Sequence, residues 1–313
     1  MSATPLPARS HVPEITIDDG GLLASLSGLP LFIQGPAFSL VADGTATARL
    51  ASPTVTTKDR LTLIAGAVGE LAVTHSIRLR ADGRVIEFGL ELVNAGPRAI
   101  QITEARAFAA RLAPGDWQGL AFACGWGEEF EPLRFGLGQP ETFETRQGRS
   151  SHGQHPWVGL EATDGRAVAI APVWSGNWKA DLAPATTGTR LAAGLSDFKF
   201  CHRLEPGERF VAPAVLVALG PTLEDASVAM SVAMGALVPR SSESEALLTE
   251  WNHWWPYTDE EIDEDVFLAN AEKAAAVGLD VCVLDAGWFG PSEQSSHWKN
   301  LRGDFDTENL ARF

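Results

Sequence analysis

From Ile15 to about Leu219 the sequence consists of short segments in which apolar and polar residues alternate, separated by turn-forming residues. The clearest example is Ile86–Leu92 (IEFGLEL), where every second residue is apolar and Glu87 and Glu91 fall on the opposite side. This period is typical of an antiparallel strand with one buried face, because successive side chains of a strand point to opposite faces. Helical periodicity is almost absent. This part of the chain is therefore predicted to be β-structure.

Turn signals separate these segments. An Asp-Gly dipeptide ending at Gly83 precedes the segment just described, and Asn-Ala-Gly-Pro beginning at Asn94 follows it, as expected for hairpin connections. Further turns are predicted where Asp-Gly ends at Gly165 and where Pro-Gly ends at Gly207. Many short strands joined in this way are typical of a β-sandwich. Residues 15–235 are therefore predicted to form a large antiparallel sandwich.

The pattern changes near the C-terminus. Val281–Leu284 (VCVL) is a continuous apolar run of the kind needed by a strand buried on both faces, and it ends at Asp285. A helix is predicted before it, between the N-cap residue Asp263 and the terminating Gly278. Before the helix, Leu247–Trp255 is another candidate strand. Strand, helix and strand form a βαβ unit, and barrel enzymes carry their chemistry at the C-terminal ends of such strands.

These patterns divide the chain into three parts. Residues 1–238 are the predicted N-terminal β-domain, which ends in a short helix at Ala226–Leu237. Residues 239–245 (PRSSESE) are polar and contain proline, as a linker does. Residues 246–313 are predicted to begin a (β/α)8 barrel. A closed barrel of this kind needs roughly 250 residues, so the barrel in this chain is predicted to be incomplete.

Charge and composition limit the classes of ligand. The formal net charge of −16 opposes binding to nucleic acids and to anionic membranes, because both present negatively charged phosphates. A neutral ligand such as a sugar is compatible with this charge. The chain contains ten Trp and one Tyr. Indole rings stack well on the C–H faces of sugars, although most tryptophans serve as core or sheet-packing residues.

The cysteines and the N-terminus bear on the compartment. Cys124, Cys201 and Cys282 are scattered and form no CxxC motif, so they are predicted to be reduced thiols in the protein core. The N-terminal segment MSATPLPARS lacks the apolar stretch of a secretory signal, and no apolar run approaches membrane-spanning length. The protein is therefore predicted to be cytoplasmic.

Metal and nucleotide sites are not indicated. His152 and His155 have a spacing seen in metal sites, but no nearby Cys or carboxylate completes a ligand set, so a turn is the simpler interpretation. The glycine-rich segments lack the strand–GxGxxG–helix order of a nucleotide site. We therefore expect no cofactor.

The C-terminal segment WNHWWPYTDEEIDEDVFLANAEKAAAVGLDVCVLDAGWFG, followed by GDF and a final Phe, resembles the start of a family's catalytic barrel. The family is glycoside hydrolase family 36, the microbial α-galactosidases, whose pattern is similar to WNSW … LDDGWFG … GDW … FP. Gly148–Leu160 and Val173–Trp178 resemble its GRSS…PF and YSGNW segments, and Leu204–Pro213 resembles the strands before its linker. The resemblance covers roughly residues 120–313 well. It implies a β-supersandwich followed by a (β/α)8 barrel.

The resemblance also implies roles for single residues. Asp285 matches the first of two consecutive Asp that bind galactose hydroxyls in the family, whereas Ala286 stands in place of the second and removes one acceptor. A carboxylate at this position accepts strong hydrogen bonds from hydroxyl groups. The alternative is that Asp285 is an N-cap or turn residue. Trp254 matches the Trp that packs against the sugar, and Trp288 is expected to be partly structural. The sequence does not show whether Asn252 or His253 faces the pocket.

Asp304 and Phe305 fall on the GDW segment of the family pattern, with Phe305 in place of Trp. That change keeps an apolar ring and loses an N–H donor. Asp285, Trp254, Trp288, Asp304 and Phe305 are the predicted substrate-binding residues.

A retaining glycosidase needs two carboxyl groups about 5–5.5 Å apart. In the family the nucleophile lies in a KWD-type motif, which this sequence does not contain. Asp285, Asp304 and Asp306 are the carboxylates near the expected pocket, and the resemblance implies that they bind or support. The full-length protein is thus expected to hydrolyse terminal α-galactosides with retention, whereas this chain carries no catalytic residue and is expected to be inactive alone.

Other functions remain open from the sequence. Ala286 and Phe305 both lie in recognition turns, so the protein could be a related α-glycosidase or a transglycosylase with a different sugar preference. The sandwich could also act alone as a non-catalytic carbohydrate-binding or assembly module, and a degraded gene product without function is the last alternative. In each enzymatic case the expected partner is a neutral α-galactoside or oligosaccharide, with no nucleic acid and no membrane. Self-association into a homo-oligomer is also expected.

Overall fold

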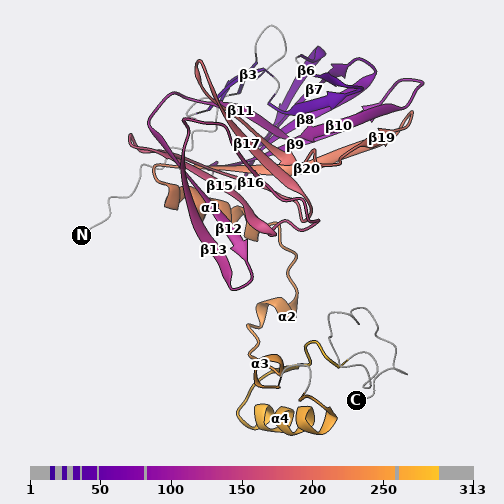
Figure 1. The fold of residues 1–313 in the computed structure, drawn as a ribbon. Helices are drawn as coiled ribbons and strands as arrows, with labels where there is room; N and C mark the ends of the chain where they lie inside the picture. Colours follow the sequence, from indigo (N-terminus) through magenta and orange to yellow (C-terminus); the bar gives the residue numbers. More distant parts are fainter. Residues whose placement is uncertain are drawn as a thin grey trace. The chain divides into compact units, whose positions relative to one another are not determined.

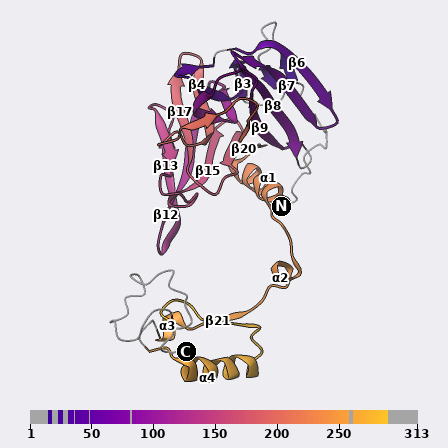
Figure 2. The same ribbon diagram turned by 90° about the vertical axis from the view of Figure 1, so that its right-hand side faces the viewer.

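The computed structural model describes residues 15–17, 23–26, 31–35, 37–47, 49–80, 83–257 and 261–288. The chain divides into two compact units, Met1–Leu237 (unit 1) and Val238–Phe313 (unit 2). Figures 1 and 2 show that the described strands of unit 1 form broad sheets, whereas the described part of unit 2 contains short helices and little β-structure. The predicted boundaries of the β-domain, the linker and the barrel start stay predictions.

The largest sheet of unit 1 has nine described strands, and each neighbouring pair is antiparallel. Its middle strand, β20, pairs with β9 on one side and with β16 on the other, so it joins segments that are far apart in the sequence. In spatial order the strands are β13 (Glu128–Gly136), β12 (Trp117–Gly125), β15 (Gly153–Ala162), β16 (Arg166–Pro172), β20 (Arg209–Gly220), β9 (Val85–Asn94), β8 (Leu71–Arg80), β7 (Leu61–Val68) and β6 (Ala51–Lys58).

Two further antiparallel sheets complete the described β-structure of unit 1. The seven-stranded sheet contains β1 (Ile15–Ile17), β2 (Leu23–Leu26), β3 (Leu31–Gly35), β11 (Phe108–Leu112), β18 (Gly188–Leu195), β17 (Trp178–Ala185) and β14 (Glu141–Glu144). The four-stranded sheet contains β19 (His202–Leu204), β10 (Ile100–Arg106), β4 (Ser39–Ala42) and β5 (Thr45–Ala46). The prediction of a β-rich, antiparallel N-terminal part is therefore confirmed.

Side chains from all three sheets meet in one hydrophobic core. In β9 the four apolar residues that alternate with glutamates and glycine are at most 1% exposed, as the sequence pattern predicted. Phe88 of β9 packs against Phe108 of β11 with ring centroids 5.0 Å apart. Trp178 of β17 is fully buried, and its indole Nε1 donates to the carbonyl of Ser150 at 2.6 Å. Burial of each large side chain stabilises the fold by about 1.5–3 kcal/mol, so the core holds the sheets together.

The outer face of the large sheet is covered by α1 (Leu223–Gly235). Ala226 and Met230 of α1 share a buried cluster with Val85 and Leu216 of the sheet. The helix begins earlier than predicted because Thr222 caps it: the Thr222 hydroxyl accepts a hydrogen bond from the Asp225 amide at 3.1 Å. Because α1 adds a second buried face, strands beneath it lose the simple alternation that one-sided burial produces.

Some features of unit 1 differ from the sequence predictions. Cys201 is exposed, and Cys124 and Cys282 are half-buried. The prediction that the cysteines lie in the core is therefore wrong, although all three are free thiols.

His155 stacks on Phe130 with ring centroids 3.9 Å apart and an interplanar angle of 8°. Among the described residues, none of the helices has the length and apolar content needed to cross a bilayer.

Unit 2 contains one parallel strand pair in its described part. After α2 (Ser242–Glu245), which lies in the predicted linker, come β21 (Glu250–Asn252), α3 (Trp254–Tyr257), α4 (Glu264–Ala276) and β22 (Val281–Val283). The register of β21 and β22 pairs Glu250 with Val281 and Asn252 with Val283. Two strands and their connecting helices form the βαβ unit expected from the sequence, whereas the (β/α)8 barrel stays a prediction.

Local contacts explain where these elements begin and end. The Asp263 carboxylate accepts a hydrogen bond from the Val266 amide at 2.8 Å and caps α4, and Gly278 follows the helix with φ +85°. Both features were predicted. The first strand is shorter than predicted because the chain turns into α3 after Asn252. The Asn252 side chain accepts from the Trp254 amide at 2.9 Å, and this contact stabilises the turn.

Candidate functional site

The C-terminal ends of β21 and β22 bring together two polar side chains that lie far apart in the sequence. Asn252 is the last residue of β21, and Asp285 follows β22 by two residues. The Asn252 side-chain amide donates to Asp285 Oδ2 at 2.9 Å. Parallel strands end at the same edge of a sheet, so the predicted carboxylate of Asp285 lies beside the side-chain amide of Asn252. The sequence alone did not show which way the Asn252 side chain points.

His253 contacts the same turn from inside the unit. Its side chain is completely buried, and its backbone amide donates to the Val283 carbonyl at 3.3 Å. Its ring nitrogen Nδ1 accepts from the Asp285 backbone amide at 2.9 Å. Because that amide can only donate, Nδ1 must be unprotonated, and the neutral ring carries its proton on Nε2. Nε2 is buried and has no hydrogen-bond partner among the described residues.

Asp285 also stabilises its own turn. Its Oδ1 accepts from the Ala286 amide at 2.7 Å, so the turn role considered from the sequence is present in the structure. An ionised carboxylate offers about four acceptor positions, and the two hydrogen bonds to Asn252 and Ala286 use part of this capacity. The side chain is half-buried. Asp285 is therefore oriented by the protein, and its hydrogen bonds with the described residues leave part of its acceptor capacity unused.

The predicted tryptophans lie close to this turn in the sequence and differ in their surroundings. Trp254 is half-buried at the start of α3, and its ring meets the His253 ring edge to face, with centroids 6.4 Å apart. Trp288 is half-buried in the turn after β22. Trp251 instead packs against Phe267 of α4 at 5.8 Å, as a structural residue does. The binding roles of Trp254 and Trp288 stay predictions.

The remaining predicted site residues, Asp304 and Phe305, lie outside the described residues. The residues that sequence reasoning left undecided are Asn252 and His253, and the structure joins both to Asp285. A signal for Asn252 was present, because an Asn at the end of a strand often caps the following turn. In the part of the chain that the structure describes, no group of three or more His, Cys, Asp and Glu side chains could hold a metal ion.

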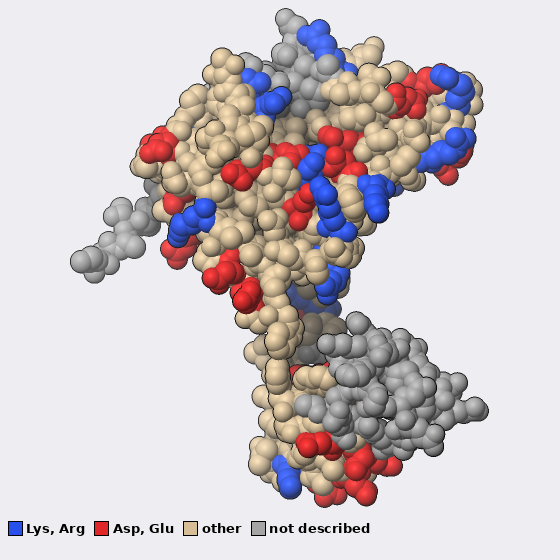
Figure 3. All heavy atoms as spheres, viewed as in Figure 1, with Lys and Arg blue, Asp and Glu red and all other residues tan. Residues whose placement is uncertain are grey.

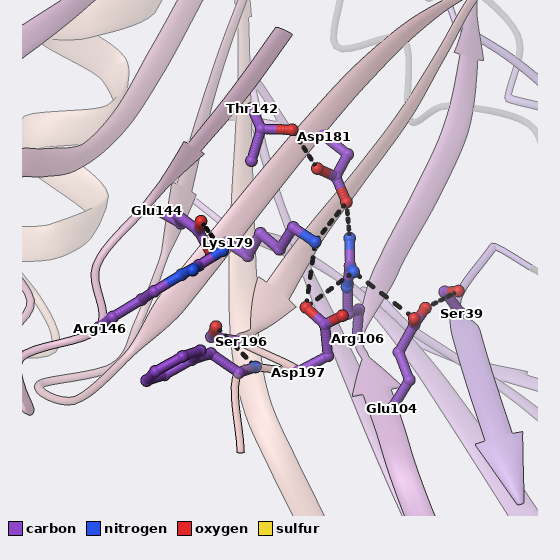
Figure 4. A network of polar contacts seen from close by, with 11 residues as sticks. Ser39, Glu104, Arg106, Thr142, Glu144, Arg146, Lys179, Asp181, Ser196 and Asp197 are labelled. Atoms are coloured by element: carbon purple, nitrogen blue, oxygen red, sulfur yellow. Dashed lines mark hydrogen bonds and ion pairs between the residues drawn. The ribbon is translucent and has the colours of Figure 1, made fainter. Parts of the chain in front are cut away.

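Unit 1 contains a second polar cluster, shown in Figure 4. Arg106 of β10 is nearly buried and forms ion pairs with Glu104, Asp181 and Asp197. Lys179 also pairs with Asp197, at 3.1 Å. A crevice of about 390 Å³ lies beside the cluster. Because each of these carboxylates is already paired with a cation, the cluster is suited to joining sheets rather than to binding a ligand.

The strand-end cluster of unit 2 offers hydrogen-bonding groups and an aromatic ring. A carboxylate, an amide and an indole suit a polyhydroxylated ligand, because they offer hydrogen bonds and a flat apolar face. Retaining hydrolysis also requires a pair of carboxyl groups about 5–5.5 Å apart, and Asp285 is the carboxylate of the described strand ends. The geometry therefore fits binding and not bond cleavage.

The sequence is similar to a known protein family and to proteins that have names. Residues 42–205 match the model of the glycosyl hydrolase family 36 N-terminal domain. Over 238 residues the chain is 28% identical to α-galactosidase AgaA of Geobacillus stearothermophilus, covering 70% of this chain and 31% of the relative. It is 25% identical over 236 residues to α-galactosidase Mel36A of Lactobacillus acidophilus, covering 72% of this chain and 32% of that protein. The chain thus spans about a third of the length of these relatives.

Solved structures show the same fold. A crystal structure of an AgaA variant from Geobacillus stearothermophilus with raffinose has a TM-score of 0.72 and 22% identity, covering 82% of this chain and 40% of that one. The galactosidase domain of the α-galactosidase–sucrose kinase AgaSK has a TM-score of 0.70 and 23% identity, with the same coverage.

Proposed function

Because this chain belongs to glycoside hydrolase family 36, we propose that it is the N-terminal part of a retaining α-galactosidase. The family match over residues 42–205 carries the proposal, and the relatives that align with the chain are named α-galactosidases. On this proposal the substrate is a terminal α-galactoside of an oligosaccharide. The nucleophile and the acid/base belong to parts of the enzyme beyond the residues present here.

In this enzyme Asp285 would accept a hydrogen bond from a sugar hydroxyl at the end of β22. Trp254 would offer its ring to the sugar, and Trp288, Asp304 and Phe305 would line the same pocket. The proposal is supported by the orientation of Asp285, whose carboxylate is held by Asn252 and by the turn while it keeps acceptor capacity. A ligand hydroxyl could therefore bind without displacing these contacts.

The proposed organisation is a supersandwich at 1–238, a linker at 239–245 and the beginning of a barrel at 246–313. The face of unit 1 in Figure 3 shows acidic and basic side chains interspersed rather than a continuous basic patch. This distribution and the net charge of −16 support a neutral substrate over a nucleic acid or an anionic membrane. A cytoplasmic location and self-association are part of the same proposal.

A different sugar preference is the second candidate function. Ala286 has a methyl group where the family pattern has a second Asp, so one acceptor for galactose hydroxyls is missing. Its backbone amide is a donor, bonded to Asp285 Oδ1, and a donor cannot replace that acceptor. A related α-glycosidase or a transglycosylase would follow if another hydroxyl arrangement fits the remaining acceptor better.

The test is to sequence the DNA that follows the codon for Phe313, to express the complete reading frame, and to assay it on aryl α-galactoside, α-glucoside and α-xyloside. We expect a continued frame with further strand-end carboxylates and turnover of the α-galactoside with retention. The 313-residue chain is expressed alone, and circular dichroism is used to check that it is folded. It is expected to show no turnover. Turnover by the short chain that Asp285→Ala abolishes would contradict the proposed location of the catalytic groups. Preference for another glycoside would favour the second candidate.

A further inference from the structure

We propose that His253 is a positioning residue that fixes Asp285 through its backbone amide; this role rests on the proposed function of Asp285 in sugar binding. His253 directly follows β21 and contacts the C-terminal end of β22 and the segment after it, one contact to each. Its amide donates to the Val283 carbonyl at 3.3 Å, and its Nδ1 accepts from the Asp285 amide at 2.9 Å. One residue thus bridges the chain on either side of Leu284, directly before the turn at Ala286 and Gly287.

The bridge begins where strand pairing stops. The last residue pair in the register of β21 and β22 is Asn252 with Val283, so ladder hydrogen bonds do not extend to Asp285. A half-buried amide without a partner is unfavourable, and the imidazole supplies the acceptor that a further strand residue would have supplied. The ring suits this task because it is rigid and completely buried, so Nδ1 has a fixed position.

Asp285 is held at both its backbone and its side chain. His253 binds the amide, and Asn252 donates to Oδ2 at 2.9 Å. These two contacts come from consecutive residues, and Asn252 also accepts from the Trp254 amide. The segment Asn252–Trp254 therefore links the proposed hydroxyl acceptor to the proposed stacking ring. Loss of the His253 contact should let Asp285 move relative to Trp254 while the side chain of Asp285 stays chemically unchanged.

The tautomer is a direct check. The proposal requires an unprotonated Nδ1 that accepts from the Asp285 amide, with the ring proton on Nε2. In the labelled 313-residue chain, NMR should show a coupling between Nδ1 and the amide nitrogen of Asp285 across the hydrogen bond, and the nitrogen shift of an unprotonated Nδ1. A protonated Nδ1, or no coupling in a folded chain, would overturn the proposal without any variant.

A matched pair of variants tests the role in the complete enzyme. His253→Asn keeps an acceptor near the position of Nδ1, whereas His253→Leu fills a similar volume without an acceptor. We expect kcat/KM for the aryl α-galactoside to fall about 30- to 100-fold in His253→Leu and by no more than about fivefold in His253→Asn. Exchange of the Asp285 amide should be at least about tenfold faster in the Leu variant only. A purely structural role would lower the thermal midpoints without this rescue by Asn.

Other outcomes distinguish this proposal from the proposed function. If both variants keep the thermal midpoint of the wild type and lose activity equally, the Nδ1 acceptor is unimportant and the positioning role is wrong. If Asp285→Asn keeps wild-type kcat/KM, the sugar-binding role of Asp285 fails and the positioning role, which rests on it, fails too. If Asp285→Asn loses activity while His253→Leu keeps it, the positioning role alone is overturned. If neither His253 variant folds, the coupling in the wild-type chain decides.

Discussion

The Arg106 cluster of unit 1 and the Asp285 cluster of unit 2 are both built around charged side chains, and they use the charge differently. Arg106 has a side chain that is 5% exposed and is surrounded by three carboxylates, with Lys179 joining two of them. Asp285 receives its described hydrogen bonds from neutral donors, the Asn252 side chain and the Ala286 amide. In the first cluster every carboxylate is paired with a cation of the fold, whereas the hydrogen bonds between Asp285 and the described residues leave acceptor positions of its carboxylate unused.

The electrostatics of the first cluster support a structural role. Burial tends to raise the pKa of Asp197, but hydrogen bonds from Lys179 and its own backbone, together with the charges of Arg106 and Lys179, hold it below the usual value. Thr142 donates to Asp181 at 2.7 Å, and Ser39 donates to Glu104. The cluster links β4 and β10 of one sheet with β14 and β17 of another, as Figure 4 shows. A structural cluster and a binding cluster can therefore be distinguished by substitution.

The largest effect is expected from Arg106→Leu. Removal of a buried partner leaves carboxylates without their cation, which costs about 3–5 kcal/mol in the free energy of unfolding. Urea denaturation of the 313-residue chain measures this loss. Arg203→Gln is the matched control, because Arg203 and its partner Glu205 are largely exposed and such surface pairs contribute little. A loss below about 1 kcal/mol in Arg106→Leu would contradict the structural role.

The opposite pattern is expected from Asp285→Asn. In the complete enzyme this change weakens an acceptor of the sugar, which should raise the activation free energy by about 2–4 kcal/mol. The thermal midpoint should fall much less than in Arg106→Leu, because an Asn oxygen can still accept from the Ala286 amide and only the hydrogen bond from the Asn252 amide is lost. The check is kcat/KM on the aryl α-galactoside together with a thermal melt. Unchanged kcat/KM would remove Asp285 from the site, and a large loss of stability would place it with Arg106 as a structural residue.

Each unit also contains a buried histidine with one bonded ring nitrogen. In unit 1 the His75 ring lies beside Phe38 and Phe88, its Nε2 donates to the Ala107 carbonyl at 2.9 Å, and its Nδ1 is buried. Burial lowers the pKa of His75 to about 4. Because the unfolded chain then binds more protons than the folded chain between pH 6.5 and 4, stability is full above pH 6.5 and falls as pH decreases through this window.

The expected loss from this histidine is about 3 kcal/mol between pH 7 and pH 4. Urea denaturation at several pH values measures it, as the difference between wild type and His75→Gln. Gln retains an N–H donor near the position of Nε2 and does not titrate, so its pH dependence should be shallower. His152→Gln is the matched control, because it makes the same substitution at an exposed side chain. Equal pH dependence in wild type and His75→Gln would contradict the prediction.

Local signals made much of the fold predictable. The alternation in β9 identified a strand with one face in the core, and Asp263 and Gly278 marked the ends of α4. The pairing of β20 with β9 and β16 was not predictable in the same way, because the paired residues are more than a hundred positions apart for β9 and more than forty for β16. The burial of the outer face of the large sheet likewise depends on α1, which comes later in the sequence.

The candidate site was predictable only in part. Asp285 could be placed at a strand end because a continuous apolar run precedes it. The orientation of Asn252 and His253 depends on where β21 stops and α3 begins, and a pattern of apolar residues does not specify this point. The predicted strand extended to Trp255, whereas in the structure the strand ends at Asn252 and α3 begins at Trp254. The contact between His253 and Asp285 follows from that turn.

The smallest effects are expected at the helix caps, where the two units differ again. Thr222 caps α1, whose Ala226, Ala229, Met230 and Ala233 are buried, whereas Asp263 caps α4, in which Ala274 is the buried residue in the described part of the chain. Removal of an N-cap acceptor costs about 1 kcal/mol.

Thr222→Ala should lower the free energy of global unfolding of unit 1 by about this amount, because α1 covers the large sheet and unfolds with it. Asp263→Ala should instead speed amide exchange in the first turn of α4 and leave the unfolding of unit 1 unchanged. Thr222→Ser and Asp263→Asn keep an acceptor and serve as controls. Equal loss of global stability from Thr222→Ala and Asp263→Ala would mean that the two units unfold together, and the contrast between them would then have to be abandoned.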